Sequence, residues 1–582
     1  MASMATDIEY DIVFAGGGAS GCLIAGRLAA ADPSLKILIL EAGEHTLNLP
    51  AHTQPVRFFT HLQPGSTTVS FNVSKPSPYV NGRSIVTPSG RCLGGGSSVN
   101  FTMYTRAAAS DYDDWETKFG NEGWSSRELI PLLKKTETYE VTPNLPTHGY
   151  SGPLKVSFGG AYTNIGKQFL EAATTYDKTR GFTEDINGLV KCNEYGRWEK
   201  WIDSETGHRS DVPHHFIYNQ TENKNLHIMT GKRVKRVIFE GDRAVGVEYV
   251  NDTTINPDTE QTVHIARAAK LVVISAGAFG SPTILERSGI GSADILQRVG
   301  VEVKADLPGV GENYQDHNVL FVPYLASEDA ETLDGLFSGD KDAEEENLKL
   351  YEHGKGFIAH NGLDAGIKMR PNEEDLKILG PAFEERWKTF FADAPDKPVV
   401  WIGTVSGYLG DHSIAPLRKY YSVGFFNEYP ASMGNVHIKS ADDANAPHDF
   451  DANFLSDPAD LVILKWGYKK SREFARRMGV FRGEYLPAHP PFSESGEAKG
   501  IKDASQPVDA SKPDVFYEDE DERILEEYLR NYTQTSWHSL GTCAMKPRSQ
   551  GGVVDDQLDV YGVNGLKVAD LDLSSKCGCQ HL

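Results

Sequence analysis

Two short, mainly apolar runs lie near the start of the sequence. Residues 10–14 and 36–40 are rich in valine, isoleucine and leucine, and residues 22–31 between them are rich in alanine and leucine. A short continuous apolar run is typical of a parallel strand that is buried on both faces, whereas the longer alanine-rich segment favours a helix. The pattern therefore predicts a strand–helix–strand unit, the building block of an α/β sheet.

The rest of the sequence mixes strands and helices. We expect strands at residues 226–229, 244–249, 271–275 and 421–426, helices at residues 460–477 and 518–531, and a long surface loop at residues 484–514, which are rich in proline, serine and glycine. The chain has 582 residues, too many for one hydrophobic core, so we expect two domains.

Composition and charge exclude several classes of function. The formal net charge of −23 would repel phosphate backbones, so we expect no nucleic-acid partner. No apolar run reaches the roughly 18 residues that a membrane span needs. The six cysteines are scattered, and we expect free thiols. No H-E-x-x-H or comparable cluster occurs, so we expect no catalytic metal.

A glycine-rich turn follows the first predicted strand. Gly16, Gly18 and Gly21 satisfy the pattern G-x-G-x-x-G, and Glu41 ends the second strand twenty positions further on. These glycines permit a tight turn, close approach to a pyrophosphate, and close packing of the helix on the sheet, while the carboxylate accepts hydrogen bonds from a ribose. Because the motif lies inside a strand–helix–strand unit, it predicts a dinucleotide site.

Three longer segments resemble one family. Residues 90–113, 277–291 and 307–317 match characteristic segments of the glucose–methanol–choline oxidoreductases. Residues 100–106, 110–114 and 537–543 resemble the fungal alcohol oxidases within that family. The resemblance extends over residues 10–570, nearly the whole chain.

The resemblance implies an interleaved architecture of α/β class, α+β overall. A Rossmann-like FAD-binding domain would collect residues 1–155, 225–320 and 523–582. A substrate-binding domain with a mixed or antiparallel sheet would contain residues 156–224 and 321–522.

The resemblance also implies FAD as cofactor and assigns residues to it. The ADP half would lie against the glycine turn and Glu41, and the flavin along the second glycine-rich segment. The expected set is Gly16, Gly18, Ala19, Ser20, Gly21, Glu41, Ala42, Arg91, Gly95, Gly96, Ser97, Asn100, Phe101, Met103, Val234, Ala276, Gly277, Trp537, Ala569 and Asp570.

The expected reaction is alcohol oxidation, which requires a base for the hydroxyl proton. Histidine suits this role because its pKa lies near working pH. Without the resemblance, His538 would have little advantage over His317 or His360 among the 18 histidines. With it, His538 is the expected base, His317 a residue that closes a turn beside Asp316, and Trp537 a side chain that narrows the pocket for small primary alcohols.

The C-terminal segment departs from the family pattern. After Asp570 the family has a proline, then a second catalytic residue and a final helix, whereas this sequence continues for only twelve residues without a proline. Gln580 falls at the position expected for the second catalytic residue. The ending Gln580-His581-Leu582 is a poor targeting tripeptide, and no secretory pattern occurs at the start, so we expect an intracellular protein, peroxisomal or cytoplasmic.

The leading hypothesis is an oxidase that uses molecular oxygen and produces an aldehyde and hydrogen peroxide. One alternative is a flavin dehydrogenase that passes electrons to another acceptor and takes a larger alcohol. A second is a relative that keeps the fold but lacks activity because of its C-terminal segment. A nicotinamide dehydrogenase is a weaker hypothesis, because such an enzyme would not be expected to carry the family segments at residues 90–113 and 277–291. Family members of this kind assemble, so a homo-oligomer is possible.

Overall fold

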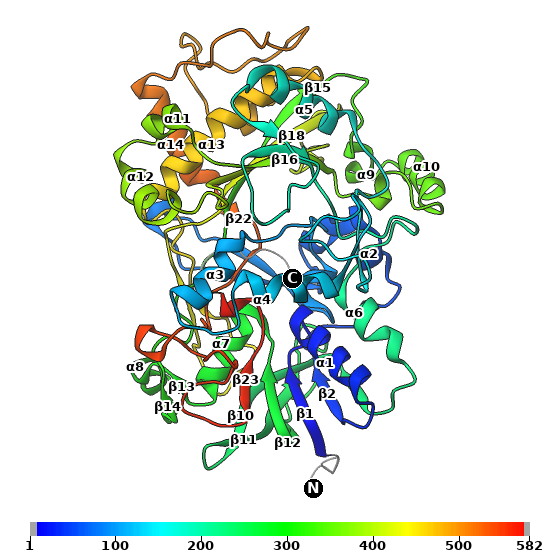
Figure 1. The fold of residues 1–582 in the computed structure, drawn as a ribbon, viewed down its shortest axis with the longest axis vertical. Coiled ribbons are helices and arrows are strands. Elements are labelled where there is room, and N and C mark those ends of the chain that lie inside the picture. Colours follow the sequence, from blue (N-terminus) through cyan, green and yellow to red (C-terminus); the bar gives the residue numbers. More distant parts are fainter. Residues whose placement is uncertain (1–8, 575–582) are drawn as a thin grey trace.

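Residues 9–574 are described by the computed structural model, in which two large sheets lie one above the other (Figure 1). The first sheet has the strand order β10-β11-β12-β1-β2-β9, with β23 also paired to β12. Its strands are β1 (Glu9–Ala15), β2 (Ile37–Leu40), β9 (Leu226–Met229), β10 (Lys232–Glu240), β11 (Arg243–Asn251), β12 (His264–Ile274) and β23 (Leu566–Val568). Strand β1 is parallel to β2 and β12, and α1 (Ala19–Ala31) connects β1 to β2. This arrangement confirms the predicted strand–helix–strand unit.

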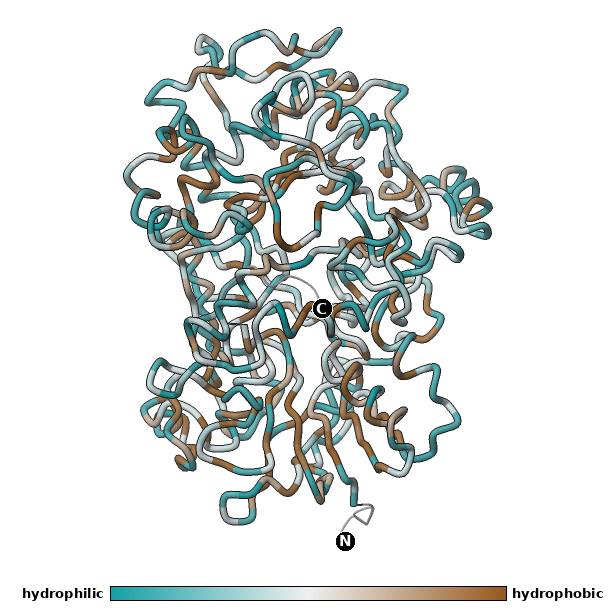
Figure 2. The backbone as a smooth tube through the Cα atoms, in the orientation of Figure 1, coloured by the Kyte–Doolittle hydropathy of each residue, from teal (hydrophilic) through white to brown (hydrophobic). Residues whose placement is uncertain are grey.

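The apolar runs of β1 and β2 are continuous because both faces of the sheet are buried. Val13 and Leu38 belong to the hydrophobic cluster on one face, and Phe14 and Ile39 to the cluster on the other. Figure 2 shows these central strands as a block of hydrophobic colour.

The second sheet has the strand order β21-β15-β18-β17-β16-β8-β7, with β22 also paired to β15. Its strands are β7 (Gly181–Phe182), β8 (Glu194–Arg197), β15 (Asn318–Ala326), β16 (Leu363–Met369), β17 (Val400–Val405), β18 (Tyr420–Asn427), β21 (Phe481–Glu484) and β22 (Gln534–Thr535). All of these pairs are antiparallel except β7 with β8, which confirms the expected mixed sheet.

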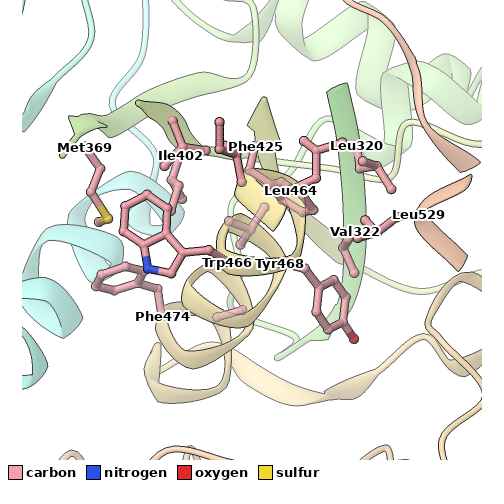
Figure 3. Packing of buried hydrophobic residues seen from close by; sticks show 14 of the residues in the cluster. Leu320, Val322, Met369, Ile402, Phe425, Leu464, Trp466, Tyr468, Phe474 and Leu529 are labelled. Carbon is pink, nitrogen blue, oxygen red and sulfur yellow. The ribbon is translucent and has the colours of Figure 1, made fainter. Parts of the chain in front are cut away.

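Helix α13 (Pro458–Arg477) covers one face of the second sheet. Trp466 and Tyr468 of this helix are buried against the sheet, where Ile402 and Phe425 point toward them (Figure 3). The neighbouring side chains Trp401 and Phe426 belong to a different cluster. Because side chains alternate along a strand, the second sheet packs on α13 with one face and presents the other to a different environment.

Smaller elements complete the described part of the chain. The other helices are α2 (Pro50–Thr53), α3 (Ala109–Thr117), α4 (Ser126–Thr136), α5 (Asn164–Tyr176), α6 (Val212–Phe216), α7 (Gly277–Arg287), α8 (Ala293–Arg298), α9 (Asp334–Ser338), α10 (Lys341–Tyr351), α11 (Glu373–Leu379), α12 (Pro381–Arg386) and α14 (Asp519–Tyr532). The other strands are β3 (Val69–Val73), β4 (Val86–Gly90), β5 (Glu137–Tyr139), β6 (Leu154–Val156), β13 (Ile290–Gly291), β14 (Ala305–Asp306), β19 (Asn435–His437) and β20 (Asp449–Asp451). None of the helices within residues 9–574 is long and apolar enough to cross a membrane.

The expected domain boundaries stay a prediction. The strands of the first sheet all fall within the three ranges assigned to the cofactor domain. Strand β15 crosses the boundary at residue 320, and β22 lies in the third cofactor range but pairs with β15 of the second sheet.

Candidate cofactor cleft and active site

A cleft with a volume of about 310 Å³ opens at the carboxyl ends of β1, β2 and β12. Ligands of open α/β sheets bind at this edge. Most residues expected at the cofactor line the cleft: Gly16, Gly18, Ala19, Ser20, Glu41, Ala42, Arg91, Gly95, Gly96, Ser97, Asn100, Val234, Ala276, Gly277, Trp537 and Asp570. The fold thus brings together residues from the beginning, middle and end of the sequence.

The turn after β1 depends on Gly16. Its φ is +112°, and a Cβ there would lie 2.4 Å from the carbonyl oxygen of Ser275. Gly18 then caps the N-terminus of α1, where backbone N–H groups and the helix dipole favour a phosphate. Gly21 does not line the cleft, and a Cβ there would lie 2.5 Å from Ser275 Oγ. Its role is the close packing of α1 on β12.

The second glycine-rich segment lies directly against the first. Gly94 N donates to Gly17 O at 2.7 Å. Gly95 has a φ of +50°, and a Cβ there would be 3.0 Å from Gly18 Cα. Larger side chains at these positions would push the two turns apart, so the glycines of both segments shape one wall of the cleft.

Two carboxylates are fixed in the cleft by backbone N–H donors and one serine hydroxyl. Glu41 accepts hydrogen bonds from Gly17 N and Gly43 N, each at 2.8 Å. Asp570 accepts from Gly277 N at 2.8 Å and from Ser281 Oγ at 2.6 Å. Burial raises the pKa of Glu41, and it raises the pKa of Asp570 to about 6. Each oxygen of Glu41 accepts one of these hydrogen bonds and can accept a second, so this carboxylate can receive ligand hydroxyls.

Basic side chains line the cleft as well. Arg91 was expected there, and its guanidinium donates to Thr254 Oγ1 at 2.7 Å. Lys232, Arg233 and Arg287 also line the cleft, and sequence reasoning missed them. Only the adjacent Val234 is assigned from the sequence, because no local pattern separates the basic residues of the segment 232–236 that face a ligand from those that face solvent. A cleft lined by cations, backbone donors and two carboxylates fits the diphosphate and hydroxyl groups of FAD.

A second cavity, of about 120 Å³, lies between the cleft and the upper sheet. Its lining is predominantly apolar and includes Trp401 and Phe426, which lie on the face of the sheet opposite α13. The expected residues Phe101 and Met103 line this cavity, and Asn100, Trp537 and His538 line both spaces. The Phe101 ring lies between Phe58 and Trp537, with centroid distances of 3.8 and 4.7 Å. The two spaces therefore meet beside His538.

The loop after β22 holds His538 at this junction. Its Nδ1 lies 2.8 Å from Ser536 Oγ and 2.9 Å from His317 Nδ1. Its backbone N–H donates to Asp316 Oδ1 at 3.1 Å. Asp316 is buried and also accepts from Thr535 Oγ1 at 2.5 Å, while burial raises the pKa of this carboxyl to about 6.

The other expected residues in the described part of the chain line neither space. His317, expected beside a turn, is fully buried with its ring against His538. His360 lines neither space and pairs with Asp364 Oδ1 at 2.9 Å. Ala569 lies behind the cleft, where its N–H donates to Ile274 O at 2.9 Å. Gln580 lies outside the described residues.

Comparison with known proteins identifies the family. Two family models described as GMC oxidoreductase match residues 10–319 and 430–581. Alcohol oxidase 1 of Komagataella phaffii is 40% identical, with 99% of this chain and 93% of that protein covered. The alcohol oxidase of Candida boidinii is 39% identical, with the same shares of 99% and 93% covered.

Solved structures share the fold. Formate oxidase of Aspergillus oryzae has a TM-score of 0.81 at 22% identity, with 99% of this chain and 96% of that chain covered. An FAD-dependent oxidoreductase of Chaetomium thermophilum has a TM-score of 0.77 at 23% identity, with 98% and 95% covered. Because the family models and the alcohol oxidases match most of its length, the chain belongs to the GMC oxidoreductase family.

Proposed function

We propose that this protein is an FAD-dependent enzyme that oxidises a primary alcohol to an aldehyde and reduces molecular oxygen to hydrogen peroxide. The observation that carries the proposal is the position of His538 where the dinucleotide cleft meets the apolar cavity. The balanced reaction is RCH₂OH + O₂ → RCHO + H₂O₂. The names of similar relatives, alcohol oxidases at about 40% identity, support the substrate class and the acceptor.

The cleft residues divide the work of holding FAD. Gly16 and Gly18 would present the α1 N-terminus to the diphosphate, and Glu41 would accept from a ribose. Gly96 and Asn100 lie at the end of the cleft that adjoins the apolar cavity, where the flavin ring would be. When bound, the flavin supplies the redox chemistry by accepting a hydride from the alcohol carbon.

The apolar cavity binds and orients the substrate carbon chain. Phe101, Trp401 and Phe426 contribute aromatic surface and exclude water from the reacting atoms. His538 accepts the hydroxyl proton as the carbonyl forms, and the side-chain amide of Asn361 offers the cavity a second polar group. Because aromatic walls leave little room beside His538, the geometry favours small primary alcohols.

The visible spectrum tests the proposal directly. Purified protein should be yellow, and ethanol added under nitrogen should bleach the flavin absorbance. If oxygen is the acceptor, readmitted air should reoxidise the flavin and restore the colour at least as fast as the enzyme turns over in steady state. Slow recolouring, with rapid recolouring by an added quinone, would favour the dehydrogenase alternative. Flavin that stays oxidised with every alcohol would contradict the proposed reaction.

Cellular location and assembly are part of the proposal. We infer a peroxisomal or cytoplasmic enzyme that forms homo-oligomers, as the family resemblance implies. Fluorescence microscopy of the chain tagged at its N-terminus would distinguish the two locations. Light scattering of the purified holoenzyme would give its mass relative to the 64.0 kDa of one chain.

A further inference from the structure

Two groups lie within hydrogen-bond distance of Nδ1 of His538, namely His317 Nδ1 and Ser536 Oγ, and these hydrogen bonds fix where its proton lies. His317 is fully buried, and its Nε2 lies 2.8 Å from the backbone carbonyl oxygen of Glu428. A carbonyl oxygen can only accept, so Nε2 of His317 must carry a proton. In a neutral imidazole the other nitrogen is then an acceptor, so His317 Nδ1 offers a lone pair.

That lone pair faces His538. The distance between His317 Nδ1 and His538 Nδ1 is 2.9 Å, so His538 Nδ1 must carry the proton of this hydrogen bond. Ser536 Oγ, 2.8 Å from the same nitrogen, donates to Asp316 Oδ1 at 3.2 Å and can accept from His538 as well. With its proton on Nδ1, a neutral His538 has its lone pair on Nε2, the nitrogen that can accept a proton from an alcohol.

The surroundings of His317 favour its neutral form. Its ring stacks on Phe426 with a centroid distance of 4.9 Å and an interplanar angle of 20°. A fully buried ring against an aromatic face would lose hydration if it became charged. A charged His317 would donate from Nδ1 instead and move the proton of neutral His538 to Nε2, where it would abolish the basic site.

We propose that His317 is a positioning residue that holds His538 in the tautomer with a basic Nε2. It acts through His538, and Asp316 supports it by accepting the backbone N–H of His538. The acceptor also stabilises the Nδ1–H of His538 after Nε2 has taken the proton, because an imidazolium is the stronger donor. This inference rests on the proposed function, since it assigns His538 the role of base for an alcohol.

Two variants of the holoenzyme test it. H317F keeps a ring that can stack on Phe426 but removes both nitrogens. H317Q keeps one acceptor for His538 and one donor for the Glu428 carbonyl. We expect the rate of flavin reduction by ethanol to fall about tenfold or more in H317F, because one charge-assisted hydrogen bond is lost. In H317Q most of the wild-type rate should return. The flavin content per chain should stay the same in both.

The pH dependence of the reduction rate separates positioning from mere support of the fold. The titratable groups that face His538 from the described residues are Asp316 and His317. Without an acceptor for Nδ1–H, protonation of His538 becomes harder, so the acidic limb of the pH–rate profile should move to lower pH in H317F and return in H317Q.

A wild-type rate and a wild-type acidic limb in H317F, or equal losses of rate in H317F and H317Q, would overturn the inference. If H317F fails to bind flavin, H317Q against H317L gives the same comparison. Wild-type protein that no alcohol reduces would instead overturn the proposed function.

Discussion

The cofactor cleft and the apolar cavity meet at His538 but are built differently. The cleft is shaped by backbone, with Gly16, Gly18 and Gly95 allowing main-chain segments to approach closely. The cavity is shaped by side chains such as Phe101, Trp401 and Phe426, which come from distant segments. A site built from backbone needs particular residues at fixed spacing, whereas a site built from apolar side chains only needs their summed shape. The cleft should therefore tolerate amino-acid substitutions poorly, whereas the cavity should accept substitutions that keep an apolar lining.

The most far-reaching effect is expected at Gly16, because a substitution there removes the cofactor on which all activity depends. In G16A the new Cβ would lie 2.4 Å from Ser275 O, and the residue would have to keep a φ of +112°. We expect flavin content to fall to about a tenth or less, because the turn that faces the diphosphate cannot form. Absorbance of the purified protein gives the measurement. G241A is the matched control, since Gly241 also has a positive φ of +56° but no neighbour within 4 Å. Equal flavin in both variants would show that the turn is not constrained.

The next effect is at His538, where cleft and cavity meet. H538A should reduce the rate of flavin reduction by an alcohol about a hundredfold or more, as expected when a general base is removed. Flavin content should stay high because the glycine turns hold the cofactor. Stopped-flow absorbance under nitrogen measures the rate, with the exposed His353 replaced by alanine as control. A decrease in this rate of less than tenfold would show that His538 is not the base.

A smaller effect is expected behind the cavity, at Glu428. This side chain is buried, and burial raises its pKa to about 7. The folded-state pKa lies above the unfolded value. The contribution of protonated Glu428 to stability is therefore fully present below about pH 4.3 and is lost as the pH rises through about 7. E428Q cannot ionise, so we expect its free energy of unfolding relative to wild type to rise by about 2.5 kcal/mol from pH 5 to pH 9. Urea unfolding at both pH values measures this. The same gain in E494Q, an exposed control, would contradict the explanation.

The smallest expected effect is in the cavity wall. F101A removes a ring between Phe58 and Trp537 and enlarges the space beside His538. We expect kcat/KM for butanol relative to ethanol to rise about tenfold, because each methylene in an apolar pocket contributes about 1–3 kcal/mol. F182A, at a half-exposed phenylalanine outside both spaces, should leave the ratio unchanged. An unchanged ratio in F101A would mean that another wall limits chain length.

Local signals in the sequence predict Gly16 and Glu41 at the cleft, whereas Arg91 and Asp570 are expected there from the family resemblance. Gly16, Glu41, Arg91 and Asp570 all line the cleft as expected. The sequence did not single out Lys232, Arg233 and Arg287, because basic residues are common on any protein surface and carry no signal of which ones face a ligand. Gln580 stays a prediction, and its place lies beyond the described residues.

The sequence by itself determined the strand–helix–strand unit and the backbone turns of the cleft, because short-range sterics of glycine and continuous apolar runs leave few alternatives. Only the tertiary structure decided which apolar residues of the upper strands face α13 and which face the cavity, as with Phe425 and Phe426. It also decided that His317, 221 positions before His538, contacts it. Pairing of distant side chains depends on the register of whole sheets, which no local pattern encodes.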